Sequence, residues 1–277
     1  MQRLLKELVI IPHDYARPEG NQPNGLLRVL LIAGVVIVLA VPQLRYRVIS
    51  LVTLPAHFKE YRQFGIRIPG QYAIHGIDVS RYQSRIDWRR VKEMEVGKIK
   101  LHFAFIKATE GTSLRDPMFR SNWTNARRHR LIRGAYHYFL PHISPRDQAD
   151  HFVKTVQLAS GDLPPVVDVE ETRGMTKDQI RRNTKTFLTL LERHYGVKPI
   201  LYTYRDFYKN HFADQPEFKG YLLWIAHFHV ANLNMPDDAD WHFWQHSDRG
   251  SVSGINARVD FNVFNGDSTA LRRLCVP

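Results

Sequence analysis

A short acidic segment is the first feature of this chain that could do chemistry. Over residues 167–170, valines alternate with Asp168 and Glu170. Alternation of period two predicts a β-strand that points both carboxylates to the same face, roughly 6.5–7 Å apart. Neighbouring carboxylates raise each other's proton affinity, which keeps one protonated near neutral pH while the other stays charged. The pair is therefore suited to acid-assisted cleavage of a glycosidic bond, although a surface strand end paired with Arg or Lys would show the same pattern.

A regular alternation of strands and helices surrounds this segment and would position it. Strand followed by helix predicts parallel strands joined by crossovers, and eight candidate strands favour a small (β/α) barrel. The crossovers around 205–220 and 227–240 are too short for full helices, so we expect an irregular second half. The predicted strands are 73–79, 103–108, 132–139, 165–170, 199–204, 221–226, 241–245 and 258–263, and the predicted helices are 88–96, 117–130, 145–159 and 177–195, the last capped by Thr176.

Acidic and aromatic residues gather near the ends of these predicted strands, where functional residues of such barrels lie. Asp78 and Asp260 belong to the first and last strands, which are neighbours in a closed barrel, so both could approach the site of Asp168 and Glu170. Aromatic rings pack against the apolar faces of sugars, and fixed polar groups hold their hydroxyls. We therefore predict a carbohydrate pocket with six further contact residues, namely Tyr136, Tyr138, Tyr202, Trp224, Trp244 and Gln245.

The amino-terminal part of the chain predicts a membrane anchor. Residues 1–25 form a short polar tail, and within residues 26–44 every position from 29 to 41 is apolar. A spanning helix needs about 20 mostly apolar residues, and the flanks favour an uncleaved anchor over a signal peptide or a buried helix. Residues 45–72 would connect it to a barrel domain at 73–277. Basic residues are balanced on its two sides, so charge leaves the orientation open.

Composition narrows the range of partners. The chain has 277 residues and a formal net charge of +12, which favours polyanions such as acidic lipids, nucleic acid or an anionic cell-wall polymer. Its basic residues are dispersed and form no nucleic-acid-binding motif, so we expect no nucleic acid partner. Cys275 is the single cysteine, and the 14 histidines include no metal-ligand spacing. We expect no metal or cofactor, and we expect His242 and His246 to belong to the core or the pocket wall.

Six ordered segments carry a resemblance to a known family. They are His75-Gly-Ile-Asp-Val-Ser-Arg-Tyr-Gln83 with Ile86-Asp-Trp88, Phe105-Ile-Lys-Ala-Thr-Glu-Gly111, Arg133-Gly-Ala-Tyr-His-Tyr-Phe139, Val167-Asp-Val-Glu170, and Val259-Asp-Phe-Asn-Val-Phe264. Together they resemble glycoside hydrolase family 25, whose lysozymes act as N-acetylmuramidases on peptidoglycan. The resemblance implies an α/β fold, an irregular, flattened (β/α) barrel of about eight strands.

The resemblance also implies roles for the acids. Glu170 would donate a proton to the leaving oxygen, and Asp168 would stabilise the positive charge on the sugar. Asp168 would do so by orienting the substrate's N-acetyl group or by acting as a nucleophile. Asp78 and Asp260 would tune charge or hold substrate.

We therefore expect a single-pass, membrane-anchored muramidase whose catalytic domain lies outside the cytoplasm. It would hydrolyse the β-1,4 bond between N-acetylmuramic acid and N-acetylglucosamine in peptidoglycan. The alternatives are a non-catalytic peptidoglycan-binding barrel and a hydrolase of another N-acetylated polysaccharide. The oligomeric state and the retaining or inverting outcome stay open.

Overall fold

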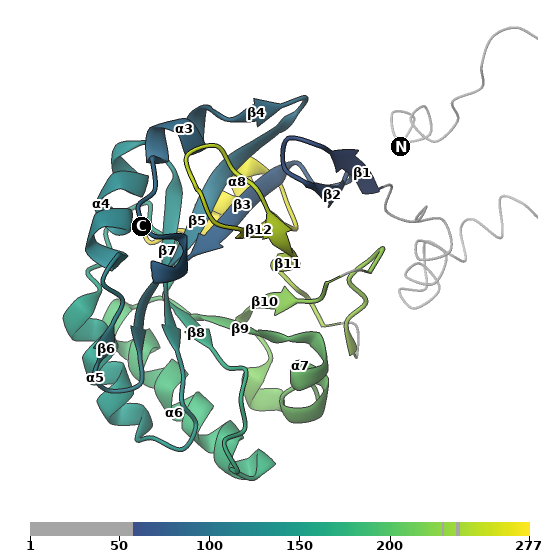
Figure 1. Cartoon of the computed structure of the whole chain (residues 1–277). Helices are drawn as coiled ribbons and strands as arrows, with labels where there is room; N and C mark the ends of the chain where they lie inside the picture. Colours follow the sequence, from purple (N-terminus) through teal and green to yellow (C-terminus); the bar gives the residue numbers. More distant parts are fainter. Residues whose placement is uncertain (1–57, 229, 237–238) are drawn as a thin grey trace, which may run out of the picture. The chain divides into compact units, whose positions relative to one another are not determined.

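The computed structural model describes residues 58–228, 230–236 and 239–277 (Figure 1). The polar tail at 1–25, the anchor expected at 26–44 and the first part of the expected connector lie outside the described residues. Among the residues that are described, no helix has both the length and the apolar character needed to cross a membrane.

Eight strands of the described chain close into a barrel, as the sequence predicts. Each strand pairs with the next in chain order, and the last pairs with the first. The closed ring brings segments from the whole domain to one end. The strands are β3 (Ile74–Val79), β5 (Ile99–Glu110), β7 (Ile132–Tyr138), β8 (Val166–Asp168), β9 (Ile200–Tyr204), β10 (Leu222–Ala226), β11 (Phe243–Gly250) and β12 (Val259–Phe264).

The direction of β12 differs from the parallel arrangement that the sequence pattern predicts. It runs antiparallel to both β11 and β3, whereas the other neighbouring strands of the barrel are parallel. Only residues 251–258 separate β11 from β12. A parallel pair needs a crossover of about a dozen residues or more, so this short connection forces an antiparallel return.

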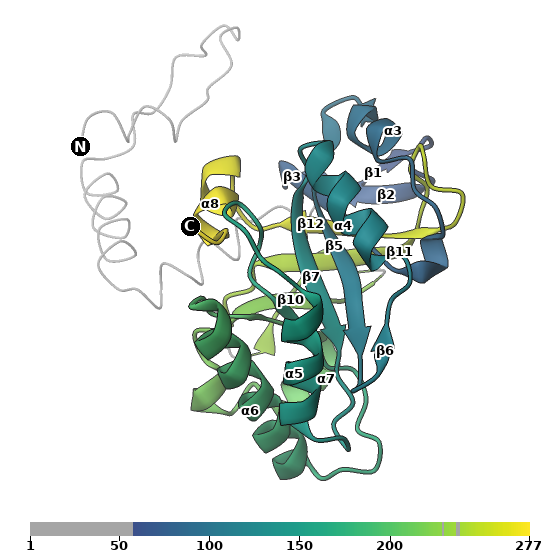
Figure 2. The ribbon, with the colours of Figure 1, turned by 90° about the vertical axis from the view of Figure 1, so that its left-hand side faces the viewer.

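Helices cover the outside of the first part of the barrel. Figure 2 shows α5 and α6 side by side, and α5 packs against β5. Thr176 caps α6 through its side chain, with Gln179 completing the capping box, as expected from the sequence. Of the two crossovers expected to be too short for full helices, the first holds a seven-residue helix, α7, and the described residues of the second, between β10 and β11, form no α-helix. The helices are α3 (Trp88–Glu93), α4 (Phe119–Arg128), α5 (Pro145–Thr155), α6 (Lys177–Tyr195), α7 (Arg205–His211) and α8 (Ser268–Leu274), with 3-10 turns η1 (Arg81–Gln83) and η2 (Pro216–Phe218) and short strands β4 (Glu95–Val96) and β6 (Leu114–Arg115).

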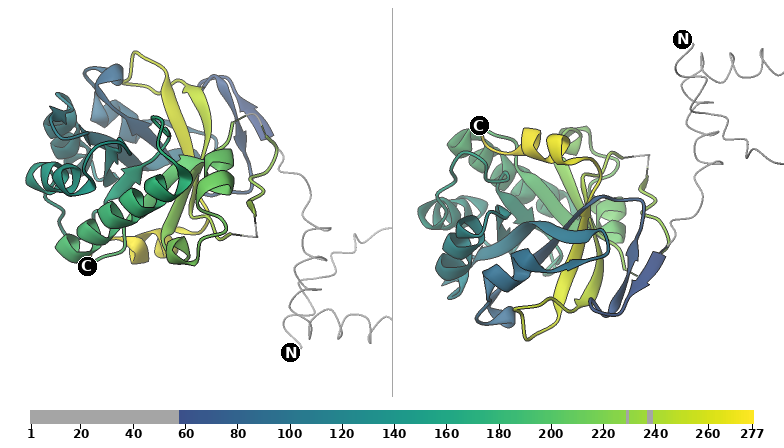
Figure 3. Two further views of the ribbon diagram at one scale, coloured as in Figure 1. Left: turned by 90° about the horizontal axis from the view of Figure 1, so that it is seen from below. Right: turned by 90° about the horizontal axis from the view of Figure 1, so that it is seen from above.

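A β-hairpin, β1 (Phe58–Tyr61) with β2 (Ile66–Pro69), packs on the outer face of the barrel. Phe64 in its turn is fully buried, and its ring centroid lies 5.3 Å from that of Phe261 on β12. The two views of Figure 3 place the hairpin on the side of the barrel opposite α4 and α5. The last part of the expected connector is therefore an ordered part of the folded domain.

Aromatic side chains fill much of the interior of the barrel. Phe105 stacks on Trp224 with ring centroids 4.1 Å apart. A Cβ atom on Gly76 would lie 2.4 Å from the Phe103 ring, and one on Gly134 would lie 2.6 Å from Phe105. The two glycines, on the strands that flank β5, therefore make room for these rings. Helix α8 contributes Leu271 to the same apolar cluster.

Candidate active site

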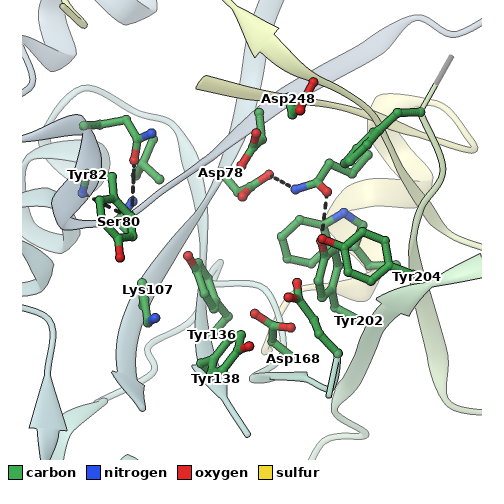
Figure 4. A pocket seen from close by; sticks show the side chains of 17 residues that line it. Asp78, Ser80, Tyr82, Lys107, Tyr136, Tyr138, Asp168, Tyr202, Tyr204 and Asp248 are labelled. Carbon is green, nitrogen blue, oxygen red and sulfur yellow. Dashed lines mark hydrogen bonds between the residues drawn. The ribbon is translucent and has the colours of Figure 1, made fainter. Parts of the chain in front are cut away.

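A pocket of about 310 Å³ lies where the carboxyl ends of the parallel strands meet (Figure 4). Carboxyl groups and aromatic rings dominate its wall, as expected for a carbohydrate site. All predicted site residues except Trp244 line it. The lining comprises Asp78, Val79, Ser80, Tyr82, Gln83, Lys107, Tyr136, Tyr138, Asp168, Glu170, Tyr202, Tyr204, Trp224, Phe228, Gln245, Asp248 and Asp260.

Trp244 corrects the prediction of a sugar contact. It precedes Gln245 on β11, and successive side chains of a strand point to opposite faces. Gln245 faces the pocket, so Trp244 faces outward, where it is fully buried against Phe58 and Tyr72. Its indole Nε1 donates a hydrogen bond to the carbonyl oxygen of His227 at 2.8 Å. The ring therefore belongs to the core.

Asp168 and Glu170 share one wall of the pocket. Asp168 ends β8, and Val169 continues the pairing by donating its backbone N–H to the carbonyl oxygen of Tyr202 at 3.0 Å. The extended backbone therefore presents both acids to the same side. Asp168 is 5% exposed, and its Oδ1 has no hydrogen-bond partner among the described residues.

The carboxyls of Asp168 and Glu170 lie close enough for each to affect the pKa of the other. Burial, reinforced by the neighbouring charge of Glu170, raises the pKa of Asp168 well above its ordinary value, whereas Lys107 opposes the rise. Burial also raises the pKa of Glu170, while its hydrogen bonds to Asp168 and Tyr202 act in the opposite direction. The pair therefore retains a proton at a pH where exposed carboxyls are ionised.

Asp78 and Asp260 form a second carboxyl pair in contact. Burial raises the pKa of Asp260 to about 9, with the charge of Asp78 as the second cause. Burial also raises the pKa of Asp78, but its Oδ2 accepts hydrogen bonds from Gln245 Nε2 at 2.8 Å and Asn262 Nδ2 at 2.7 Å. These two donors favour charge on Asp78 and leave the proton on Asp260.

Rings on the pocket wall hold those two amides in orientation. Tyr202 donates its hydroxyl to Gln245 Oε1 at 2.8 Å, and Trp224 Nε1 donates to Asn262 Oδ1 at 2.8 Å. Each amide therefore turns its NH₂ group toward Asp78. Asn262 was not among the predicted site residues, although it alternates with Asp260 on one strand and so shares its face.

Other residues of the pocket that the sequence analysis did not select lie at its mouth and wall. Tyr82 is 70% exposed and Tyr204 is 40% exposed, so both rings are open to a ligand. Lys107 Nζ lies 2.8 Å from Glu110 Oε2 and 4.8 Å from the centroid of the Tyr138 ring. Within the described part of the chain, no cluster of three or more His, Cys, Asp or Glu residues is placed to hold a metal ion.

The model of the family described as glycosyl hydrolases family 25 matches residues 77–255. The chain belongs to this family. As a family 25 member, it is a glycoside hydrolase, in a family of lysozymes and muramidases.

Relatives of this family 25 enzyme include characterised and uncharacterised proteins. Lysozyme M1 of Streptomyces globisporus is 34% identical over 218 residues, which cover 73% of this chain and 71% of the relative. The uncharacterised protein YegX of Escherichia coli K12 is 49% identical over 213 residues, covering 76% and 77% of the two chains.

Solved structures agree with the fold. The bacterial lysozyme from Streptomyces coelicolor superimposes with a TM-score of 0.69 at 32% identity, covering 74% of this chain and 98% of that one. A family 25 glycosyl hydrolase from Bacillus anthracis gives 0.67 at 32% identity, covering 78% and 99%. The closed α/β barrel of eight strands is therefore the fold of family 25 lysozymes.

Proposed function

We propose that this family 25 enzyme hydrolyses the β-1,4 bond between N-acetylmuramic acid and N-acetylglucosamine in peptidoglycan. The observation that carries the proposal is the contact between the Asp168 and Glu170 carboxyls on the wall of an aromatic-lined pocket. The similarity to lysozyme M1 supports the choice of substrate.

Glu170 is the proposed general acid. It is partly exposed to the pocket, whereas Asp168 is buried behind it. The proton that the pair retains can move between the two carboxyls, and from Glu170 it reaches the leaving glycosidic oxygen. Once the proton has left Asp168, its charge stabilises the positive sugar ring.

Asp168 would assist by one of two routes. Its Oδ1, which has no hydrogen-bond partner among the described residues, would be the atom that meets a substrate N–H or the anomeric carbon. The first route orients the N-acetyl group as an internal nucleophile, and the second forms a covalent glycosyl–enzyme intermediate. Lys107, the cation on the pocket wall, favours the ionised form of Asp168 in both routes.

The second pair would hold the substrate. Protonated Asp260 donates its proton to Asp78 and keeps its other oxygen as an acceptor, and Asp78 offers an acceptor fixed by two amide groups. Tyr136 and Tyr202 remain neutral because burial raises the pKa of both hydroxyls. Sugar hydroxyls would therefore meet a fixed set of donors and acceptors.

We further propose that residues 26–44 anchor the enzyme in a membrane with the barrel outside the cytoplasm. The apolar run from 29 to 41 supports the anchor, and the location of peptidoglycan supports the orientation. Fractionation of cells that express the full chain, with protease added to intact spheroplasts, tests both points. Recovery of the barrel in the soluble fraction would contradict the anchor, and resistance of the barrel to protease added to intact spheroplasts would contradict the orientation.

Digestion of purified peptidoglycan tests the reaction. The new ends are reduced with borohydride and identified by mass spectrometry. Reduced muramic acid at the new ends supports the proposed bond, and reduced glucosamine contradicts it. Retention of glycan without new reducing ends would identify a binding barrel, and cleavage confined to another N-acetylated polysaccharide would identify a different substrate.

A further inference from the structure

A second pocket, of about 530 Å³, lies outside the barrel between the β1–β2 hairpin and β11. It is larger than the catalytic pocket, and its lining combines apolar surface with two arginines. The residues that line it are Phe58, Gly65, Ile66, Arg67, Val230, Ala231, His246, Ser247 and Arg249.

His246 gives this second pocket an unsatisfied polar group. The side chain is 4% exposed, and neither ring nitrogen has a hydrogen-bond partner among the described residues. Burial lowers the pKa of His246 to about 3, so its neutral ring presents one donor and one acceptor. Buried polar groups in folded proteins are normally paired, which makes this imidazole a candidate partner for a ligand.

Two exposed guanidinium groups give the same pocket a positive rim. Arg67 lies with its Nη2 3.4 Å from the carbonyl oxygen of Phe58 and its guanidinium 5.9 Å from that residue's ring centroid. Arg249 pairs with Asp248 at 3.4 Å, and both side chains are about half exposed. Guanidinium groups recognise carboxylates through paired hydrogen bonds, so the rim favours a carboxylate ligand.

Strand β11 separates the second pocket from the catalytic one. Gln245 and Asp248 line the catalytic pocket, whereas His246 and Arg249 line the second. Asp248, which lines the catalytic pocket, is followed directly in the chain by Arg249, which lines the second pocket. An extended peptide of three or four residues reaches about 10–14 Å, and neighbouring strands lie about 5 Å apart, so a peptide branch of the substrate is long enough to cross one strand.

We propose that the second pocket binds a carboxylate of the stem peptide carried by the muramic acid residues of the substrate. This inference rests on the proposed function, because it places the glycan in the catalytic pocket and its peptide branch across β11. The aliphatic stem side chains would contact Phe58 and Ile66, and the carboxylate would contact Arg67 and Arg249.

Binding of the free peptide tests the site without any need for catalysis. The full chain carrying Glu170→Gln is titrated with a stem tetrapeptide bearing free carboxylates, and binding is followed by ligand-detected NMR. We expect Arg67→Ala to weaken binding at least fivefold, His246→Phe to weaken it to a similar degree, and Arg89→Ala, on α3 away from both pockets, to leave it unchanged. Thermal unfolding verifies that each variant is folded. Equal binding by the Arg67→Ala protein, or equal binding of a peptide whose carboxylates are amidated, overturns the proposal.

Turnover separates a failure of this inference from a failure of the proposed function. The otherwise unaltered enzyme is given peptidoglycan and the same glycan stripped of its peptides. We expect Arg67→Ala to lower kcat/KM severalfold on the peptide-bearing polymer but not on the stripped one. Equal effects on both polymers overturn the peptide site alone, whereas absence of cleavage of either polymer by the unaltered enzyme overturns the proposed function.

Discussion

Asp78 and Asp260 stand directly opposite each other across the antiparallel pair β3–β12. Because β12 runs against β3, its first residues lie at the same end of the barrel as the last residues of β3. A parallel β12 would carry Asp260 to the opposite end. The reversed last strand thus completes the acidic wall of the catalytic pocket.

The protonated state of Asp260 predicts how stability depends on pH. The pKa of Asp260 is raised to about 9 in the folded state, so the proton is bound by the folded but not the unfolded chain between about pH 4 and 9. Stability contributed by this group is full below pH 4 and is lost as pH rises through that window. We expect Asp260→Asn to flatten the decline and to raise Tm at pH 8 by several degrees, measured by calorimetry. An unchanged pH profile would contradict the assignment.

Loss of the proposed acid should remove activity and leave the fold intact. Glu170→Gln cannot donate the proton, and general acid catalysis contributes about 10²–10⁴-fold to a rate. We expect a loss of at least that order in released reducing ends, with an unchanged circular dichroism spectrum. Glu93→Gln, at an exposed position of α3, serves as the matched control. Full activity of the Glu170→Gln protein would remove this residue from the mechanism.

Lys107 should set the acid limb of the pH–rate profile. Its charge lowers the pKa of Asp168, which must be ionised in the proposed mechanism. Lys107→Met should therefore raise that pKa and move the acid limb of kcat to higher pH, while Lys107→Arg keeps the original limb. A uniform drop in rate with no shift would show a structural role instead.

Gly76 should not tolerate a side chain. An added Cβ would lie 2.4 Å from the Phe103 ring inside the barrel. We expect Gly76→Ala to lower the free energy of unfolding by about 1–3 kcal/mol, as overpacking does. Combining it with Phe103→Leu should recover part of the loss, because the smaller side chain frees the space. Independent, additive losses in the double variant would show that the two positions do not compete.

Much of the fold follows from local pattern. The period-two runs and helical spacings predict all eight barrel strands and, for α6, both ends (Lys177–Tyr195). The direction of β12 does not follow from its own residues, because only the length of the preceding connection determines it. The prediction for Asp260 was therefore correct in place, although the strand direction behind it was wrong.

For the site, too, local pattern predicts the position of some residues and not of others. Trp244 and Gln245 are adjacent on one strand, so the alternation rule allows only one of them to face the pocket, and the predicted set included both. Asn262 shares a face with Asp260 and was within reach of the same rule. Asp248 follows a register shift in β11 near Ser247, and no local pattern in the sequence signals where such an irregularity turns the side chains.

The seam between β3 and β12 has a consequence for biosynthesis. It pairs Ile74 with Phe264, so the first strand of the barrel can pair on this side only after the last strand, β12, has been synthesised. Helix α8, which contributes Leu271 to the aromatic interior, is made later still. The ring therefore cannot close before β12 has been synthesised, and its closure depends on contacts between residues far apart in the sequence, which form slowly.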